Sequence, residues 1–204
     1  MRSPIHRLLA GTRLTILLVT TVAAADTHPA VAPNQDFSNP MFLLHAPASE
    51  GWHGFQQSAR GIAFAKDGAQ RGESYVAEVT LFSMPQMENN NLFVAYVKEQ
   101  LEKDSPPERF DVLENDVQYT GERGYPCVKY HGVSNDRKAR VSMFSRQTLR
   151  LEVIALYCEY PSRVGTGFAV VYSHRGTTAD EHFAADGASF IEGVQAHSAA
   201  HVPH

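Results

Sequence analysis

The segment Tyr75-Val-Ala-Glu-Val-Thr-Leu-Phe82 decides the fold class, because its residues alternate between two faces. Every second residue is apolar or small, which is the pattern of a half-buried strand: Tyr75, Ala77, Val79 and Leu81. Shortly after it the period becomes that of an amphipathic helix, with apolar residues at i, i+3, i+4 and i+8: Phe93, Tyr96, Val97 and Leu101. A strand pattern followed by a helix pattern predicts a mixed fold.

Both predicted helices have recognisable start signals. Residues 89–91 are three asparagines that can cap the first helix, and Ser105-Pro106-Pro107 ends it after about four turns. Thr178-Ala-Asp-Glu181 has the spacing of a capping box for the second helix. The apolar stripe of that helix is Phe183, Gly187, Phe190, Ile191 and Val194.

Strand candidates flank the first helix on both sides. They are residues 42–45, 52–57 and 61–65 before Tyr75, and residues 110–119, 125–131, 138–145, 149–157 and 168–173 after the helix. The order of strands, helix, strands and helix predicts an α+β domain, in which an antiparallel sheet of about six or more strands has two main helices packed on it.

One hairpin can be given a register. Arg146-Gln-Thr148 is interpreted as a three-residue loop, which places Phe144 opposite Arg150 and predicts a cross-strand cation–π contact. A second hypothesis treats four basic residues as a patch for an acidic partner: Lys138, Arg140, Arg146 and Arg150.

A resemblance follows from this order of elements. Trp52 before a short strand, the Tyr75 strand, the middle helix, the run Tyr172-Ser-His-Arg-Gly176 and a last helix ending in Phe190-Ile191 resemble the PsbP/Mog1-like α/β/α sandwich over about residues 40–195. The resemblance implies an adaptor or binding protein rather than an enzyme. It assigns no functional residue.

The first 25 residues have the pattern of a cleavable signal peptide. Arg2, Arg7 and Arg13 precede a short apolar run that ends in Ala23-Ala-Ala25. The run is about half the length that spans a bilayer, so we expect cleavage, no membrane anchor and a soluble protein in the bacterial periplasm. We further expect a flexible lead-in over 26–40, one α+β domain over 41–195 and a flexible histidine-bearing tail over 196–204.

Charge argues against nucleic acid as a partner. The three arginines of residues 1–25 leave with the signal, so 15 of the 18 basic residues remain against 22 acidic ones, a formal charge of −7. Nucleic acids and anionic membranes both require a basic surface. The expected partner is therefore an unidentified protein or small molecule.

Cys127 and Cys158 are the two cysteines, and an exported chain with two thiols is expected to pair them. The strand assignment conflicts with this expectation. If residues 125–131, 138–145 and 149–157 form a simple meander, the cysteines lie two strands apart, beyond the reach of a disulfide. The disulfide prediction is retained, and one of the two inferences must fail.

No motif of a common enzyme class is found, and neither a catalytic residue nor a cofactor is expected. Ser173 and His174 are adjacent in a predicted strand and so point to opposite faces, which prevents a nucleophile–base contact. Tyr172–Gly176 is interpreted as a structural turn in which Arg175 pairs with an acidic side chain.

Both ends of the mature chain carry candidate metal ligands. If cleavage follows Ala25, the new N-terminus Asp26-Thr27-His28 can bind Cu(II) or Ni(II) in a square plane. His197, His201 and His204 are spaced to align on a helix and could bind zinc. Three functions follow: a non-enzymatic binding or interaction module, which we favour; a periplasmic Cu, Ni or Zn protein; and an enzyme of unrecognised class.

Overall fold

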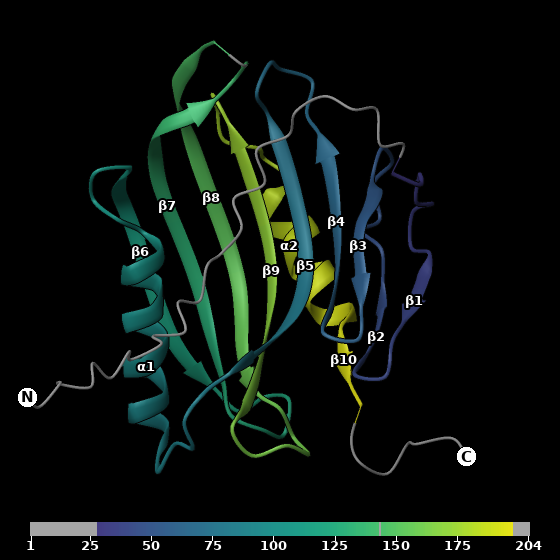
Figure 1. The fold of residues 1–204 in the computed structure, drawn as a ribbon, viewed down its shortest axis with the longest axis vertical. Helices are drawn as coiled ribbons and strands as arrows, with labels where there is room; N and C mark the ends of the chain where they lie inside the picture. The colour runs from purple at the N-terminus through teal and green to yellow at the C-terminus, as the bar shows by residue number, and fades with distance from the viewer. Residues whose placement is uncertain (1–27, 143, 198–204) are drawn as a thin grey trace, which may run out of the picture.

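The computed structural model of the chain describes residues 28–142 and 144–197. Seven of the strands in this part are β3 (His53–Ser58), β4 (Gly61–Asp67), β5 (Ser74–Ser83), β6 (Phe110–Thr120), β7 (Cys127–Arg140), β8 (Arg146–Glu159) and β9 (Thr166–Gly176). They form one antiparallel sheet in the order β3-β4-β5-β9-β8-β7-β6 (Figure 1). Two helices pack on it, so the predicted α+β class is confirmed.

One face of the sheet carries the larger core. Helix α2 (Phe183–Gly193) covers its central strands, beside a small sheet of β1 (Asp36–Ser38), β2 (Phe42–His45) and β10 (Gln195–Ala196). Apolar side chains of both sheets and of α2 meet there, as the 6.4 Å between the ring centroids of Phe64 and Phe190 illustrates. The predicted apolar face of β5 belongs to this core, with Ala77 and Val79 fully buried.

The opposite face is covered at one end by helix α1 (Asn90–Asp104). Asn89 caps the helix as predicted, because its side chain accepts a hydrogen bond from the Leu92 N–H. The apolar stripe of α1 packs on β6 and β7 and forms a second, smaller core. The helix stops at Ser105, where two prolines follow.

The prediction of separate strands over 125–131 and 138–145 was wrong, because β7 runs without a break from Cys127 to Arg140 and so joins the two ranges. Gly132, between the predicted strands, lies in the ladder opposite Val153, and a Cβ at this position would collide with the Tyr130 hydroxyl. Asp136, also between them, is held in the strand by an ion pair with Arg109. Specific side-chain contacts therefore explain why residue types that usually form turns lie inside a strand here.

The predicted hairpin register was also wrong. Arg140 pairs with Arg146, so residues 141–145 form the connection. Phe144 is then an exposed loop residue, while Arg150 lies between Asn135 and Gly176 in the sheet, and no cross-strand contact joins Phe144 and Arg150. Arg150 donates a hydrogen bond to the Glu152 carboxylate. Its charge is therefore compensated within the sheet and does not add to the proposed basic patch.

Helix α2 begins later than the capping box predicted. Its N-cap is His182, whose side chain makes no capping hydrogen bond. The Asp180 carboxylate instead accepts hydrogen bonds from the His182 N–H and from the Tyr75 hydroxyl. Asp180 is therefore fixed by β5, and the reciprocal pairing of Thr178 with Glu181 does not form.

The described part of the lead-in is packed, unlike the flexible segment expected over 26–40. Val31 is buried, its N–H donates to the Trp52 carbonyl, and Ala30 forms a bridge with His53. Asp36–Ser38 form β1 against β2. Neither of the two helices described is long and apolar enough to cross a membrane, and residues 1–25 lie outside the described residues.

Candidate functional site

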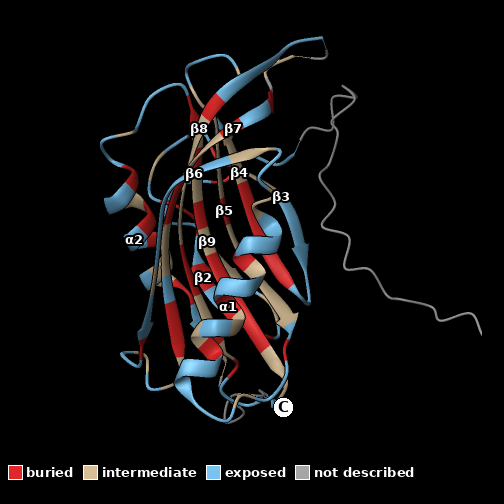
Figure 2. Ribbon diagram, turned by 90° about the vertical axis from the view of Figure 1, so that its left-hand side faces the viewer, coloured by how far each residue is buried: buried red, intermediate tan, exposed pale blue. Residues whose placement is uncertain are grey.

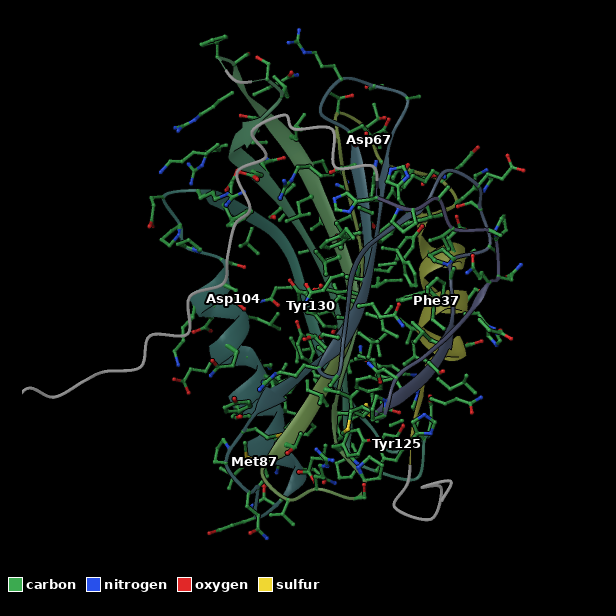
Figure 3. The ribbon with its side chains drawn as sticks, turned by 45° about the vertical axis from the view of Figure 1, so that its right-hand side comes forward. Phe37, Asp67, Met87, Asp104, Tyr125 and Tyr130 are labelled. Atoms are coloured by element: carbon green, nitrogen blue, oxygen red, sulfur yellow. A yellow bond between two sulfur atoms is a disulfide. The ribbon has the colours of Figure 1, made fainter. Side chains whose placement is uncertain are left out.

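Three connecting segments meet at one end of the seven-stranded sheet. They are residues 84–89 after β5, residues 121–126 between β6 and β7, and residues 160–165 between β8 and β9. Together they line a pocket of about 540 Å³, here called the loop-end pocket. Figure 3 shows two of its lining residues, Met87 and Tyr125, at this end of the molecule. Binding sites are often formed by loops on a rigid scaffold, as they are here.

Backbone hydrogen bonds connect these segments to one another. The Met84 N–H donates to the Gly165 carbonyl over 3.1 Å, and the Glu159 N–H donates to the Pro126 carbonyl over 3.0 Å. The 160–165 turn closes on itself where the Tyr160 N–H donates to the Thr166 carbonyl. Gly165 has φ +74°, a conformation that favours glycine. These backbone hydrogen bonds therefore hold the walls of the pocket in a fixed arrangement.

The disulfide lies beside this pocket. Cys127 and Cys158 occupy directly opposed positions of β7 and β8 and are bonded to each other, so the predicted pair is present. Because β7 is continuous from Cys127 to Arg140 and pairs directly with β8, the strand assignment was the inference that failed. The residues next in sequence, Pro126 and Glu159, belong to the pocket lining. The bond therefore joins two of its walls.

An aromatic cluster supports the pocket from the core side. The ring of buried Phe168 lies 6.0 Å from that of Tyr160 and 6.1 Å from that of Tyr125. The Tyr160 hydroxyl lies 2.9 Å from the carbonyl oxygens of Met41 and His197 and donates its single proton to them. Burial raises the pKa of Tyr160, which stays protonated at neutral pH. The Tyr160 ring is thereby held in place.

Polar and apolar atoms contribute about equally to the accessible surface of the lining. It includes two methionines, two tyrosines and three prolines: Met84, Met87, Tyr125, Tyr160, Pro85, Pro126 and Pro161. Its charged groups are one acid and one base, Glu159 and Arg163. Val164 is 82% exposed at the edge. Methionine and aromatic side chains make adaptable contacts with flat apolar groups, and polar groups of the lining lie beside them.

The Ser173-His174 pair lies elsewhere and does not form a catalytic arrangement. Tyr172–Gly176 is part of β9 rather than a turn, and adjacent residues of a strand point to opposite faces. His174 is 1% exposed and its Nε2 lies 3.0 Å from a carboxylate oxygen of Glu73. Arg175 approaches the Asp136 carboxylate at 3.4 Å, which confirms the predicted acidic partner. These contacts are structural.

Glu78 is a perturbed carboxylate in the middle of the sheet. It lies on β5, and burial raises its pKa. Its neighbours across the ladder are Ala63 and Val171, neither of which titrates. A second acid, base or nucleophile would be needed next to it for acid–base catalysis. The directly opposed strand positions supply none, and a titratable group on which the Glu78 charge acts is the partly buried Tyr157 of β8, whose pKa is raised mainly by burial.

The predicted metal ligands are only partly within the described residues. His28 is exposed near Phe37, and His197 follows β10 beside Tyr160. Asp26, Thr27, His201 and His204 lie outside the described residues. In the part of the chain that the structure describes, no group of three or more His, Cys, Asp or Glu side chains could hold a metal ion. The metal assignments stay predictions.

Sequence reasoning did not identify the loop-end pocket. Its lining comes from segments that lie up to 82 residues apart, between Met84 and Thr166, and none contains a recognisable motif. The Pro and Gly residues that mark these segments as loops were the only local signal. Their meeting depends on the strand order, which the sequence pattern does not specify.

Comparisons with known proteins add little beyond the fold. No family model matches the chain, and no curated protein matches it. A solved structure of a mutant form of protein Mog1 is similar, with 10% sequence identity and a TM-score of 0.38. The match covers 78% of this chain and 96% of that chain. This is a likeness of fold only, and no statement about function is drawn from it.

Proposed function

We propose that this chain is an exported, non-enzymatic binding module whose loop-end pocket takes an uncharged, flat, largely apolar ligand such as an aromatic ring. One observation carries the proposal: a pocket of about 540 Å³, of the size that small ligands occupy, is lined by methionine, tyrosine and proline, and backbone hydrogen bonds hold its walls in a fixed arrangement. A pocket with fixed walls loses less conformational entropy when a ligand binds.

Export to the periplasm is supported by two features. The first 25 residues have a basic start, a short apolar run and a small-residue end. The Cys127–Cys158 disulfide belongs to chains that fold in an oxidising compartment. Because the disulfide joins two pocket walls, the compartment in which the protein folds also affects its binding site.

The absence of catalysis is proposed from the chemistry of the lining. Its described residues include no histidine and no thiol. The Tyr160 hydroxyl is engaged by two backbone carbonyls, and its raised pKa makes it a poor base or nucleophile. The remaining charged groups, Glu159 and Arg163, are placed to orient a polar substituent on an apolar ligand.

Binding of N-phenyl-1-naphthylamine, an uncharged aromatic dye that fluoresces in apolar sites, tests the proposal. We expect saturable one-to-one binding to the mature protein. Met87→Ala removes part of a wall and Gln86→Trp fills the pocket with an indole, so both should weaken binding at least fivefold. Phe144→Ala is the matched control, because Phe144 lies in the β7–β8 connection, at the other end of these strands.

The same variants also show which results would refute the proposal. Circular dichroism must show that both pocket variants keep the wild-type fold. If folded Met87→Ala and Gln86→Trp bind the dye as tightly as Phe144→Ala does, the dye sits elsewhere and the pocket assignment is wrong. Lack of any saturable binding refutes the proposed ligand class.

A further inference from the structure

Strand β6 forms one edge of the seven-stranded sheet. Its inner side pairs with β7 over Phe110–Thr120, and no other described strand pairs with its outer side. Figure 2, in which this edge faces the viewer, shows the strand mostly exposed. An edge strand presents unpaired N–H and C=O groups along its length and can accept another extended chain. At 11 residues, β6 is long for an unprotected edge.

Three large apolar side chains are exposed on this one strand. Val112, Leu113 and Tyr119 are each between 42% and 57% exposed. Val112 and Leu113 lie at a β-bulge, where the register with β7 shifts between Val112 and Glu114. The regular ladder of Asn115–Thr120 is free of the bulge, so that segment is the part best suited to pair with a partner strand.

The charge of β6 is entirely acidic. It carries Asp111, Glu114 and Asp116 and no lysine or arginine. The Glu114 carboxylate lies 2.9 Å from His131 Nδ1. No described cation lies within 4.0 Å of Asp111 or Asp116. Two uncompensated carboxylates therefore remain on the edge, where a lysine would be the common protection against unwanted pairing.

A groove adjoins this edge on the α2 side of the sheet. It has a volume of about 380 Å³ and runs between β6, β7 and α2, with Asp116 from β6 and Glu192 from α2 in its lining. The basic residues in the lining are already engaged. Arg123 donates to the carbonyl oxygens of Val194 and Ile191 at the end of α2, and Lys129 pairs with Glu122. Asp116 and Glu192 have no described cationic partner. The Arg123 guanidinium keeps its charge among neutral carbonyl oxygens, so the lining carries three carboxylates (Asp116, Glu122 and Glu192) against two cations (Arg123 and Lys129), an excess of one negative charge.

We infer that the β6 edge and this groove dock an extended, basic segment of a partner protein, which adds to the sheet as an eighth strand. Alternate side chains of an added strand point to the same face, so every second residue would face the groove. Lysine or arginine at those positions meets Asp116 and Glu192. The groove and the loop-end pocket share no lining residue, although the β6–β7 connection contributes Glu122 and Arg123 to the groove and residues 124–126 to the pocket. The inference does not rest on the proposed function.

A second copy of the chain fits this edge poorly. If two β6 strands paired antiparallel, several registers would oppose like charges, such as Asp111 against Asp116 of the second copy or Glu114 against its own copy, and every register would bring two acidic segments together. Like charges on directly opposed strands are destabilising. Charge complementarity therefore favours a basic strand over self-association.

Titration with a short synthetic peptide tests the inference. The probe is acetyl-TKVKVRT-amide, which places basic residues at alternate positions, and the mature protein is used at low ionic strength. We expect one-to-one binding that weakens as salt is added. The acidic analogue acetyl-TEVEVET-amide should not bind. A form of the basic peptide methylated on alternate backbone nitrogens keeps its charge but cannot pair as a strand, and it should bind at least tenfold more weakly.

Protein variants distinguish binding of the peptide at the groove from nonspecific electrostatic attraction to an acidic protein. Asp116→Asn combined with Glu192→Gln should weaken binding about tenfold. The matched control is Glu50→Gln combined with Asp67→Asn, which removes the same charge from exposed positions away from β6. Met87→Ala should leave peptide binding unchanged. Equal binding of the methylated peptide, equal effects of the two double variants, or a dimer held through β6 in sedimentation experiments would each overturn the inference.

Discussion

The guanidinium of Arg109 holds the fully buried carboxylate of Asp136 with two hydrogen bonds, 3.0 Å from Nε and 2.7 Å from Nη2. Arg175 of β9 approaches the same carboxylate at 3.4 Å. The Asp136 side chain also accepts a hydrogen bond from the Lys138 N–H at a β-bulge. One carboxylate thus links the start of β6 to β7 and β9.

Removing this charge should destabilise the protein strongly. In Asp136→Asn, Arg109 and Arg175 would both lose their buried counter-charge, and breaking a buried pair costs about 3–5 kcal/mol. Urea denaturation should therefore show a large decrease in the free energy of unfolding. Asp111→Asn, an exposed change on the neighbouring strand, is the control and should alter it by less than about 0.5 kcal/mol. Similar values for the two variants would contradict a structural role for the pair.

The contribution of Asp136 to the free energy of unfolding should also depend on pH. Burial alone would raise the pKa of Asp136, but hydrogen bonds from Arg109 and the Lys138 N–H, with the Arg175 charge, hold it below its ordinary value of 3.8. Its contribution is complete above pH 3.8 and is lost as the pH falls through the lowered pKa. The difference in unfolding free energy between wild type and Asp136→Asn should shrink as the solution is acidified from pH 5. A constant difference would refute the shift.

Asp136 also explains where sequence reasoning succeeded and failed. Helix α1 and strand β5 were predicted because their apolar faces follow a regular period and need no distant partner. Strand β7 was divided in two because Gly132 and Asn135-Asp136 have the composition of a turn. Contacts with Tyr130 and Arg109 decide their conformation, and those partners are recognised only when the fold is known.

The candidate sites were harder to predict from the sequence than the helices and strands that carry them. Tyr125 and Tyr160 were visible as aromatic residues near loops, but their approach to a common Phe168 depends on the order of β7, β8 and β9. The exposed edge of β6 depends on the same order. A single sequence records local periods, whereas strand order arises from long-range packing.

The two cysteines should be protected from alkylation. Mass spectrometry of the unreduced mature protein should show no modified thiol, because Cys127 and Cys158 are bonded. Replacing both by alanine should lower the free energy of unfolding by about 3.7 kcal/mol, the loop-closure value for a separation of 31 residues. It should also weaken dye binding, because the bond joins two pocket walls. Two alkylated thiols in the unreduced protein would refute the bond.

If the protein is exported with cleavage of its signal peptide, we expect a single mature N-terminus. Terminal sequencing of the protein purified from its native source should begin at Asp26, after the small-residue run Ala23–Ala25. That terminus would also place His28 third, so Cu(II) titration of the same sample tests the predicted metal ligands. Retention of Met1 in the mature protein would contradict export.

Chemical-shift mapping tests the central proposal, the loop-end pocket as a binding site, most directly. Two-dimensional ¹H–¹⁵N spectra of the mature protein would be recorded while N-phenyl-1-naphthylamine is added. The account predicts that the shifted amides cluster in residues 84–87, 124–126 and 159–166, which line the pocket. Shifts confined to other parts of the sheet, or no saturable shift in those three segments, would contradict it.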